Sequence, residues 1–285
     1  MSDESVILEA SAPLDLRLSE AELEAVRDHV TDFIRRTVDS AGAEGAVLGL
    51  SGGIDSTLTA HLAVEALGAE RVHGLVMPSE VNAADNMSDA ERVARDLGVE
   101  YDVIDIGPIY DAFVEAFPGE ATAERVDTDP LRTAAGNVRV RIRAVLDYFV
   151  ANAENRIVLG TGNRSEALTG YFTKYGDGAV DCHPIGNLYK QQVRQLAAHV
   201  GVDDDLVTKT PSAEMWTGQT DEAEMGLGYD TLDAILALHV DGPLSRAATV
   251  RHLDVTPEQV DRVVDLYETS AHKRSMPPSP DPLYL

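Results

Sequence analysis

The stretch AVLGLSGGIDS, residues 46–56, decides the fold of this chain. Its first five residues form a short apolar run typical of a buried strand, and the Gly-Gly pair that follows marks a tight turn. A helical pattern begins at about Ser56. Adjacent glycines let backbone N–H groups approach an anion closely, and the N-terminus of a helix adds unpaired donors and a partial positive charge. The stretch therefore predicts a strand, a loop and a helix that together hold a phosphate group.

Two serines and one acidic residue define the chemistry expected of this loop. The hydroxyl groups of Ser51 and Ser56 can donate hydrogen bonds to phosphate oxygens. Asp55 carries the same sign of charge as a phosphate, so its position makes sense if Mg²⁺ lies between the two. The pattern is neither the P-loop G-x-x-x-x-G-K-[ST] nor the dinucleotide pattern G-x-G-x-x-G. A simple Gly-Gly turn, in which Asp55 caps the helix, is the alternative.

Strand and helix patterns alternate along most of the chain. This β-α-β order predicts an α/β fold, a doubly wound parallel sheet flanked by helices, in a single domain spanning 1–285, with a small helical C-terminal element at 244–272. Ligands of such sheets bind outside the carboxyl ends of the strands, which places the site in the loops 51–56, 77–86 and 161–190. We expect strands over 46–50, 72–77, 99–106 and 156–160, and helices over 16–38, 56–67, 86–97 and 138–151.

The composition is strongly acidic. The net charge is −26 and the pI is about 4.5, so we expect neither nucleic acid nor an anionic membrane as a partner. Self-repulsion of this size opposes a compact state unless salt screens it, and at molar salt the Debye length falls to roughly 3 Å. We interpret the composition as adaptation to high internal salt, with an ordinary acidic cytosolic protein as the alternative. The 23 basic residues include only four lysines: Lys174, Lys190, Lys209 and Lys273.

Further features of the sequence indicate a cytoplasmic protein. Apolar residues make up 44% of the chain, but no run approaches the roughly 20 consecutive apolar residues that span a bilayer. The first five residues, MSDES, are acidic and differ from a signal peptide. Cys182 is the single cysteine, which excludes an intrachain disulfide framework and a cysteine-rich metal site. It also restricts thiol catalysis to one position, where no neighbouring base marks it as a nucleophile.

Several motifs resemble those of a known family. The loop at 51–56 resembles the SGGxDS loop of the ATP pyrophosphatases, which adenylate a substrate and release pyrophosphate, but several of their families share it. Residues 160–181, GTGNRSEALTGYFTKYGDGAVD, resemble the NAD synthetase segment of the form GT…E…TGxFTKYGDGxxD. The resemblance covers about residues 20–280. It includes GNVRVR (136–141), similar to the family's GNxxxR helix, PSAEMWTGQTDE (211–222), similar to its mobile loop, and HKR (272–274), similar to its HK pair.

This resemblance implies an ammonia-dependent NAD synthetase, from a halophilic archaeon given the charge. Such an enzyme converts deamido-NAD to NAD with ATP and ammonia through a deamido-NAD adenylate, and releases AMP and pyrophosphate. ATP is then a co-substrate and Mg²⁺ a cofactor. The segment that resembles the pyrophosphatases begins near residue 45, which leaves no room ahead of it for a glutamine-hydrolysing domain, so free ammonia is the expected nitrogen donor. The family also implies a homodimer with the deamido-NAD site near its interface.

The resemblance assigns roles to individual residues. Asp55 and Glu166 would bind Mg²⁺ on the phosphates, and these two carboxylates with Lys190 would form the catalytic group. The family usually has Thr where Ser212 stands, but the hydroxyl is kept. The ATP site would comprise Gly49, Leu50, Ser51, Gly52, Gly53, Ile54, Asp55, Ser56, Thr161, Lys190 and Ser212, and the deamido-NAD site Arg141, Lys174, Asp181, His272 and Lys273.

Three other functions compete with this interpretation. Another adenylating amidotransferase of the same superfamily would share residues 49–56 but should lack the TGYFTKYGDG block. A nucleotide-binding module without catalysis would explain the glycine-rich loop, but not Asp55 and Glu166 together. A transcription factor built on the helices of 244–272 would need a basic surface for DNA, and the charge of this chain argues against it.

Overall fold

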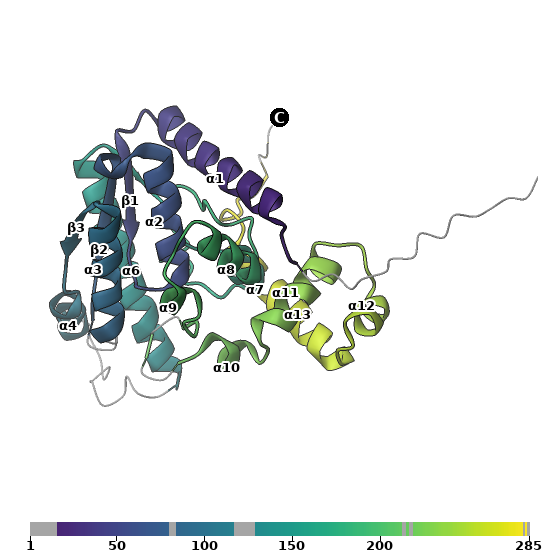
Figure 1. Ribbon diagram of the computed structural model, residues 1–285. Coiled ribbons are helices and arrows are strands. Elements are labelled where there is room, and N and C mark those ends of the chain that lie inside the picture. The colour runs from purple at the N-terminus through teal and green to yellow at the C-terminus, as the bar shows by residue number, and fades with distance from the viewer. Residues whose placement is uncertain are drawn as a thin grey trace, which may run out of the picture.

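A parallel four-stranded sheet forms the centre of the molecule (Figure 1). The computed structural model describes residues 16–79, 84–116, 129–212, 215–216, 219–281 and 283. The strands are β1 (Gly45–Gly49), β2 (Val72–Val76), β3 (Glu100–Val103) and β4 (Arg156–Val158), in the order β3-β2-β1-β4. The chain winds outward from β1 to β3 and then returns to the other side of β1. The expected doubly wound sheet is thus confirmed, and its switch point lies at the carboxyl end of β1.

Helices cover both faces of this sheet, and others form a separate lobe (Figure 1). The α-helices are α1 (Glu20–Ala41), α2 (Ile54–Leu67), α3 (Ala84–Leu97), α4 (Gly107–Ala116), α6 (Asp129–Ala153), α7 (Arg164–Thr169), α8 (Lys190–His199), α9 (Asp204–Val207), α10 (Asp221–Met225), α11 (Tyr229–Ile235), α12 (Arg246–Leu253) and α13 (Pro257–Thr269). Short 3₁₀ turns lie at Ala69–Arg71 and Ala271–Lys273, and a π-helical turn at Leu236–Val240.

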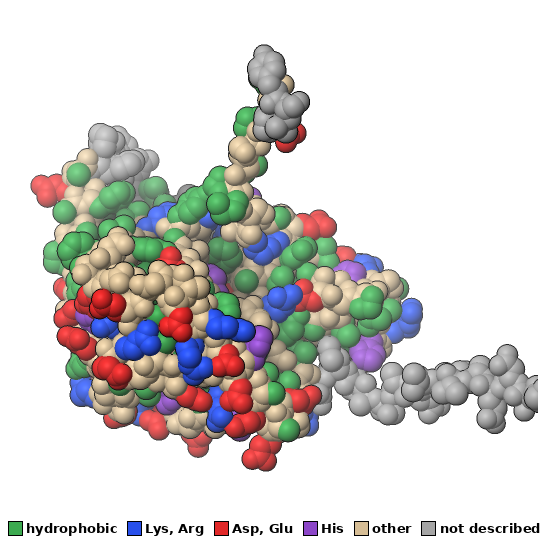
Figure 2. Space-filling model, turned by 90° about the horizontal axis from the view of Figure 1, so that it is seen from above, with side chains coloured by type: hydrophobic (Ala, Val, Ile, Leu, Met, Phe, Trp, Pro, Cys, Tyr) green, Lys and Arg blue, Asp and Glu red, His purple; other side chains and the backbone are tan. Residues whose placement is uncertain are grey.

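The surface carries the acidic composition. Figure 2 shows Asp and Glu side chains spread over the face seen from above, with Lys and Arg side chains between them. Within the described ranges, no helix is both long enough and apolar enough to cross a membrane.

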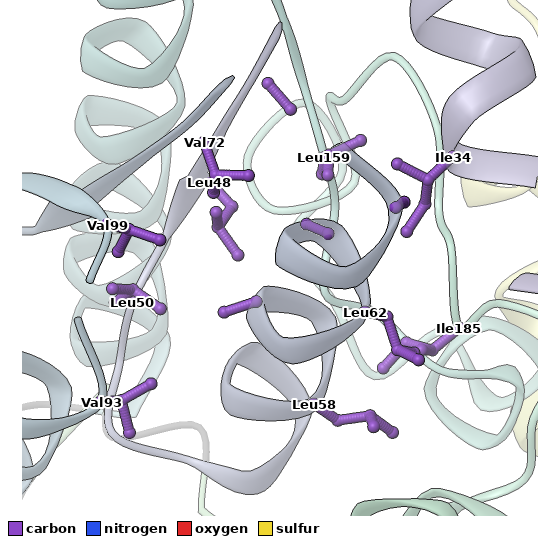
Figure 3. Packing of buried hydrophobic residues seen from close by; sticks show 14 of the residues in the cluster. Ile34, Leu48, Leu50, Leu58, Leu62, Val72, Val93, Val99, Leu159 and Ile185 are labelled. Atoms are coloured by element: carbon purple, nitrogen blue, oxygen red, sulfur yellow. The ribbon is translucent and has the colours of Figure 1, made fainter. Parts of the chain in front are cut away.

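The residues of β1 alternate between two apolar layers, as the period of a strand requires. Ala46 and Leu48 point to the layer formed with α1, α2, α3 and α8, whereas Val47 points to the layer formed with α6. Helix α2 is buried along most of its length, and Figure 3 shows its Leu58 and Leu62 among the packed side chains of the first layer. The helix that follows the phosphate loop is therefore held firmly against the sheet.

The C-terminal helices have an apolar core of their own. Helices α11 and α13 bury Tyr229, Leu232, Val260 and Val263 in a cluster separate from the two sheet layers. This lobe packs against the sheet domain where α11 meets α8 and where α13 meets α7. The small helical C-terminal element expected for 244–272 is present as α12 and α13.

Several boundaries differ from the expectation, and those of α6 and β3 affect the surroundings of the site. Helix α6 begins at Asp129 and not near 138. Its first turns contain Pro130 and Gly136, which favour a loop in isolation, but proline is well tolerated in the first turn of a helix. Gly136 allows Met215 to pack closely on the helix, since Met215 Cε lies 2.6 Å from where a Cβ on Gly136 would stand. Strand β3 is an edge strand of four residues, after which the chain leaves the sheet and enters α4 at Gly107.

We predict that the two glycines of β1 respond differently to alanine. A Cβ on Gly45 would lie 2.1 Å from the backbone oxygen of Arg71, which cannot move without disturbing the adjacent strand β2. A Cβ on Gly49 would meet Met77 Cε at 3.6 Å, an ordinary contact. Gly45→Ala should therefore lower the free energy of unfolding by roughly 1–3 kcal/mol, and Gly49→Ala should change it little. Urea unfolding in molar KCl measures both, and equal stabilities would contradict the assignment.

Candidate active site

The phosphate loop closes on itself through its serines. Gly52 has a φ of 74°, which a residue with a side chain rarely adopts. The hydroxyl groups of Ser51 and Ser56 lie 3.1 Å apart, and Ser56 Oγ also accepts from the Ser51 N–H at 3.2 Å. The first N–H groups of α2 have no carbonyl partner within their own helix. The loop therefore aims backbone donors and hydroxyl groups at one point above the sheet.

One lysine joins the loop to the segment that follows β4. The Nζ of Lys190 pairs with Asp55 Oδ2, and it lies 3.5 Å from Glu166 Oε1. Asn163 Nδ2 donates to the other oxygen of Asp55 at 2.9 Å. Lys190 is only 2% exposed. The three residues expected to form the catalytic group thus converge from α2, α7 and α8, although they are far apart in the sequence.

The charges of this cluster perturb one another. Burial, and after it the nearby charge of Asp55, raise the pKa of the Glu166 carboxyl to about 8, although the charge of Lys190 opposes the rise. Burial alone would lower the pKa of Lys190, but the charges of Asp55 and Glu166 outweigh it and hold that pKa above its ordinary value. A third carboxylate, Asp221, is buried beside the lysine, and burial raises its pKa as well. The centre therefore holds three carboxyl groups against one lysine, and a carboxyl there keeps a proton near neutral pH unless a bound cation compensates its charge.

Local hydrogen bonds explain how the sequence builds this arrangement. Asn163 and Glu166 form a capping box at the start of α7, with bonds of 3.0 and 3.2 Å between each backbone N–H and the other side chain. Asp233 of α11 accepts the hydroxyl of Ser165 and, at 2.9 Å, the N–H of Gln191. The C-terminal lobe thereby holds the first turn of α8, which carries Lys190.

A cavity of about 500 Å³ opens beside the cluster. It lies between the carboxyl ends of the strands, helix α6 and residues 209–212 and 215–216. The cavity is therefore at the edge of the sheet where ligands are expected to bind. The cavity is lined by every residue of the expected ATP site, namely Gly49, Leu50, Ser51, Gly52, Gly53, Ile54, Asp55, Ser56, Thr161, Lys190 and Ser212, and also by Glu166 and Lys273.

The other residues expected at the deamido-NAD site lie outside this lining. Arg141 donates to the Lys174 carbonyl at 3.1 and 3.3 Å, and Lys174 Nζ donates to the His272 carbonyl, so these three form a group of their own. Asp181 accepts the Val158 N–H at 2.7 Å and the Tyr148 hydroxyl at 3.2 Å. In this structure Asp181 therefore connects β4 to α6 through hydrogen bonds and is not among the residues that line the cavity.

Lys209 belongs to none of the motifs quoted from the sequence, and no role was expected for it. Its Nζ donates to the carbonyl of Gly52, in the phosphate loop, at 3.0 Å and pairs with Asp89 Oδ2 at 2.6 Å. It also lines the cavity. The scarcity of lysine in this chain was the signal that could have singled it out. Asn163 and Asp221 were missed too, because their roles depend on contacts between distant segments.

The segment expected to be mobile lies over the cavity. Met215 and Trp216 line it, and the guanidinium of Arg132 stacks on the Trp216 ring at 4.7 Å. The Ser212 hydroxyl donates to the Gln219 carbonyl at 2.7 Å, and Gln219 Oε1 accepts the Met215 N–H at 2.7 Å. The remainder of this segment, 213–214 and 217–218, is outside the described residues.

The donor set fits a magnesium ion whose ligands would come partly from the protein and partly from a bound phosphate chain. The structure has no group of three or more His, Cys, Asp or Glu within its described ranges that could hold a metal by itself. Mg²⁺ commonly takes one or two carboxylates and completes its shell with water and substrate phosphates. Asp55 and Glu166 provide two such carboxylates beside the phosphate loop, and their uncompensated charge favours a cation there.

A doubly wound sheet with a phosphate-binding loop at its switch point and a charged cluster in a cavity above it defines a nucleotide-binding α/β protein. Residues 26–277 match the family model described as NAD synthase. The chain belongs to the NAD synthase family.

Individual relatives agree with this assignment. An NH(3)-dependent NAD(+) synthetase of Halobacterium salinarum is 60% identical over 269 residues, which cover 94% of this chain and 97% of that protein. Among solved structures, an NMN synthetase from Francisella tularensis has a TM-score of 0.77 at 34% identity, covering 93% of this chain and 100% of the other. An NH3-dependent NAD synthetase from Campylobacter jejuni has a TM-score of 0.73 at 31% identity, covering 91% and 99%.

We predict that removing the charge of Glu166 stabilises the protein in the absence of ligands, most strongly at alkaline pH. Its pKa in the folded protein is about 8, above the 4.5 that is ordinary for a glutamate carboxyl. The folded state therefore keeps a proton that the unfolded state loses as the pH rises between these values, and this lowers stability across that window. Glu166→Gln should remove this loss while keeping the capping box, and its advantage should grow by up to about 1.4 kcal/mol per pH unit.

Urea unfolding without Mg²⁺ at pH 5, 7 and 9 tests this sign. The exposed Glu100→Gln serves as the control for loss of one surface charge. An advantage of Glu166→Gln that is the same at pH 5 and pH 9 would show that the carboxyl does not titrate as described.

Proposed function

We propose that this protein converts deamido-NAD to NAD with ATP and ammonia. The observation that carries the proposal is the convergence of Asp55, Glu166 and Lys190 beside the phosphate loop, in a cavity large enough for a nucleotide. The name of the H. salinarum relative supports ammonia as the nitrogen donor. A binding module without catalysis would gain nothing from burying two carboxylates against one lysine, because such burial is costly.

The first chemical step is adenylation of a carboxylate. The nicotinate carboxylate attacks the α-phosphate of ATP, pyrophosphate leaves, and an acyl-adenylate with a good leaving group results. Both reactants are anions, so neutralising their charge is a large part of the catalysis. Lys190 and the N–H groups of the loop hold the phosphates, while Asp55 and Glu166 hold Mg²⁺, which when bound neutralises phosphate charge. Lys209, bonded to the loop carbonyl of Gly52, keeps the loop in shape.

The second step is attack by ammonia on the acyl carbon, with departure of AMP. The protein supplies position and charge for this step and no covalent nucleophile. Cys182 fits no such role, because burial raises the pKa of its thiol to about 11. Residues 209–212 and 215–216, which line the cavity, limit access of water to the adenylate.

We assign the far side of the cavity to deamido-NAD. Lys273 lines it and donates to the carbonyls of Gly170 and Phe172 at 2.7 and 2.8 Å. The TGYFTKYGDG block reaches helix α6 there, because the Thr173 hydroxyl donates to Asn137 at 2.6 Å. The family pattern adds Arg141, Lys174, Asp181 and His272. In this proposal Arg141, Lys174 and His272 contact the part of deamido-NAD that extends from the cavity.

A smaller substrate is the second candidate. The F. tularensis neighbour is an NMN synthetase, and the corresponding reaction would amidate nicotinate mononucleotide. The higher identity to NAD synthetases, 60% in the H. salinarum relative, favours deamido-NAD. Both substrates present the same carboxylate, so the same residues would carry out either reaction.

The decisive experiment measures NAD formation in molar KCl with Mg²⁺, ATP, deamido-NAD and ammonium, using a coupled dehydrogenase. NAD should form only when ATP and ammonium are both present, and glutamine should not replace ammonium. Asp55→Asn should lower kcat/KM by at least roughly 100-fold. Asp96→Asn, on the exposed face of α3, is the matched control.

Each failure of this experiment has its own meaning. Pyrophosphate release with nicotinate mononucleotide but not with deamido-NAD would show that the mononucleotide is the substrate and that deamido-NAD is not. Release of pyrophosphate with neither, in salt where the protein is folded, would overturn the proposal.

We also propose that the protein works in the cytoplasm of a cell with high internal salt. The net charge of −26 and the four lysines among 23 basic residues support this. Its 60% identical relative comes from Halobacterium salinarum. Hydrated carboxylates that repel one another at low ionic strength are screened at molar salt.

A homodimer is the assembly that best accounts for an apolar face on α4 and α6. Val145 and Phe149 point outward from α6 and are 68% and 70% exposed. Ile109 and Phe113 of α4, which packs against α6, are 41% and 47% exposed. Large apolar side chains gathered on one face usually mark an interaction site.

The dimer gives a direct prediction. Light scattering after size exclusion in molar KCl should give twice the chain mass of 30.7 kDa for the wild type. Val145→Glu combined with Phe149→Glu should give the chain mass, because burying two carboxylates in an apolar interface is unfavourable. Met276→Glu, at an exposed apolar residue elsewhere, should leave the dimer intact. A wild type of single mass would contradict the assignment.

A further inference from the structure

Helix α6 carries a carboxylate into the cavity that neither the family motifs nor the chemistry above uses. Asp147 lines the part of the cavity that is next to Gly49, the last residue of β1. Its Oδ1 is buried and has no hydrogen-bond partner among the described residues. Burial raises the pKa of this carboxyl to about 7, with Arg143 opposing the rise. Buried polar atoms without a partner are rare and costly, which suggests that the partner of Asp147 is a ligand.

The surroundings of Asp147 form a slot that is largely apolar, although Arg143 also lines the cavity and its charge acts on Asp147. Leu75, Met77, Ala144 and Val158 line the cavity around it. Gly49, the last residue of β1, has no side chain here, and Asp147 Oδ1 lies 3.9 Å from where a Cβ would stand. Such a slot fits a flat, weakly polar group that presents a hydrogen-bond donor at one edge.

The opposite character of the loop end fixes the direction of a bound nucleotide. Residues 51–56 and Lys190 provide N–H donors, hydroxyl groups and positive charge for phosphates. The slot begins two residues earlier in the chain, at Gly49, in the same cavity. A nucleotide with its phosphates at the loop can therefore place its base over Gly49, beside Asp147.

We propose that Asp147 selects the base of the nucleotide, by accepting a hydrogen bond from the exocyclic amino group of adenine. This rests on the proposed use of ATP. Guanine carries a carbonyl oxygen at the equivalent position, and this acceptor would face the acceptor of Asp147. A site built to accept a hydrogen bond rejects an analogue without the donor, because a buried polar group is then left unpaired. Asp147 is thus a specificity residue, separate from the residues that carry out the reaction.

The test compares three triphosphates: ATP, GTP and purine riboside triphosphate, which lacks the amino group. Binding by calorimetry and kcat/KM for NAD formation are both measured in molar KCl. The wild type should prefer ATP to the purine analogue by roughly 10- to 100-fold. Asp147→Leu should reduce this preference to less than roughly threefold, because it should weaken the binding of ATP and leave that of the purine analogue unchanged. Asp96→Leu, an exposed carboxylate of α3, is the matched control.

A second variant keeps the test valid if Asp147→Leu does not fold. Asp147→Asn retains an acceptor oxygen but can turn its amide to donate to the guanine carbonyl, so it should still prefer ATP to the purine analogue while discriminating less against GTP. Unchanged ratios in both variants would overturn the role of Asp147. A smaller preference for ATP over GTP in Asp147→Leu would support it, because the acceptor that faces the guanine carbonyl is then gone. Calorimetric preference for ATP without NAD formation would instead refute the proposed reaction and leave the base selection standing.

Discussion

The ion pair between Lys190 and Asp55 holds the active site together. It joins the helix after the phosphate loop to α8, and through Asn163 and Glu166 it also fixes α7. Removing one partner of a buried pair leaves an uncompensated charge, which typically costs about 3–5 kcal/mol. Because Asp233 of α11 anchors the first turn of α8, the C-terminal lobe also contributes to the position of this lysine. Loop, sheet and lobe are therefore coupled through a few buried polar contacts.

The same cluster is unfavourable for stability when no ligand is bound. Asp55, Glu166 and Asp221 surround one lysine, and the raised pKa of Glu166 reflects first its burial and then the repulsion from the neighbouring carboxylates. In the proposed reaction this imbalance favours binding of Mg²⁺, whose charge would offset that of the carboxylates and of the phosphates. The acidic surface poses a related problem over longer distances. Salt can screen the exposed surface but not the buried cluster, so only ligands relieve the latter.

Much of the fold and part of the site could be predicted from the sequence. The strands and the phosphate loop depend on local patterns, such as the apolar run before Gly52 and Gly53, and the site residues expected for ATP all line one cavity. The expected start of α6 is too late, because Pro130 and Gly136 favour a loop in isolation and only the fold shows Met215 packing on Gly136. The roles of Asn163, Lys209 and Asp147 depend on contacts between segments that are distant in sequence. No motif records such contacts, and the resemblance gave no hint of where Asp181 would lie.

The placement of the lysines has a practical consequence. Lys190, Lys209 and Lys273 line the cavity, and Lys174 pairs with the backbone of His272 next to Lys273. No lysine remains on the rest of the surface, since the chain has only these four. Amine-selective reagents, which label most proteins at many scattered positions, would have targets here only around the cavity and at the chain terminus. Ordinary acylation chemistry thereby becomes a reporter of occupancy: the yield at Lys209 and Lys273 would follow which part of the cavity a ligand covers, whereas Lys190 is buried in its ion pair.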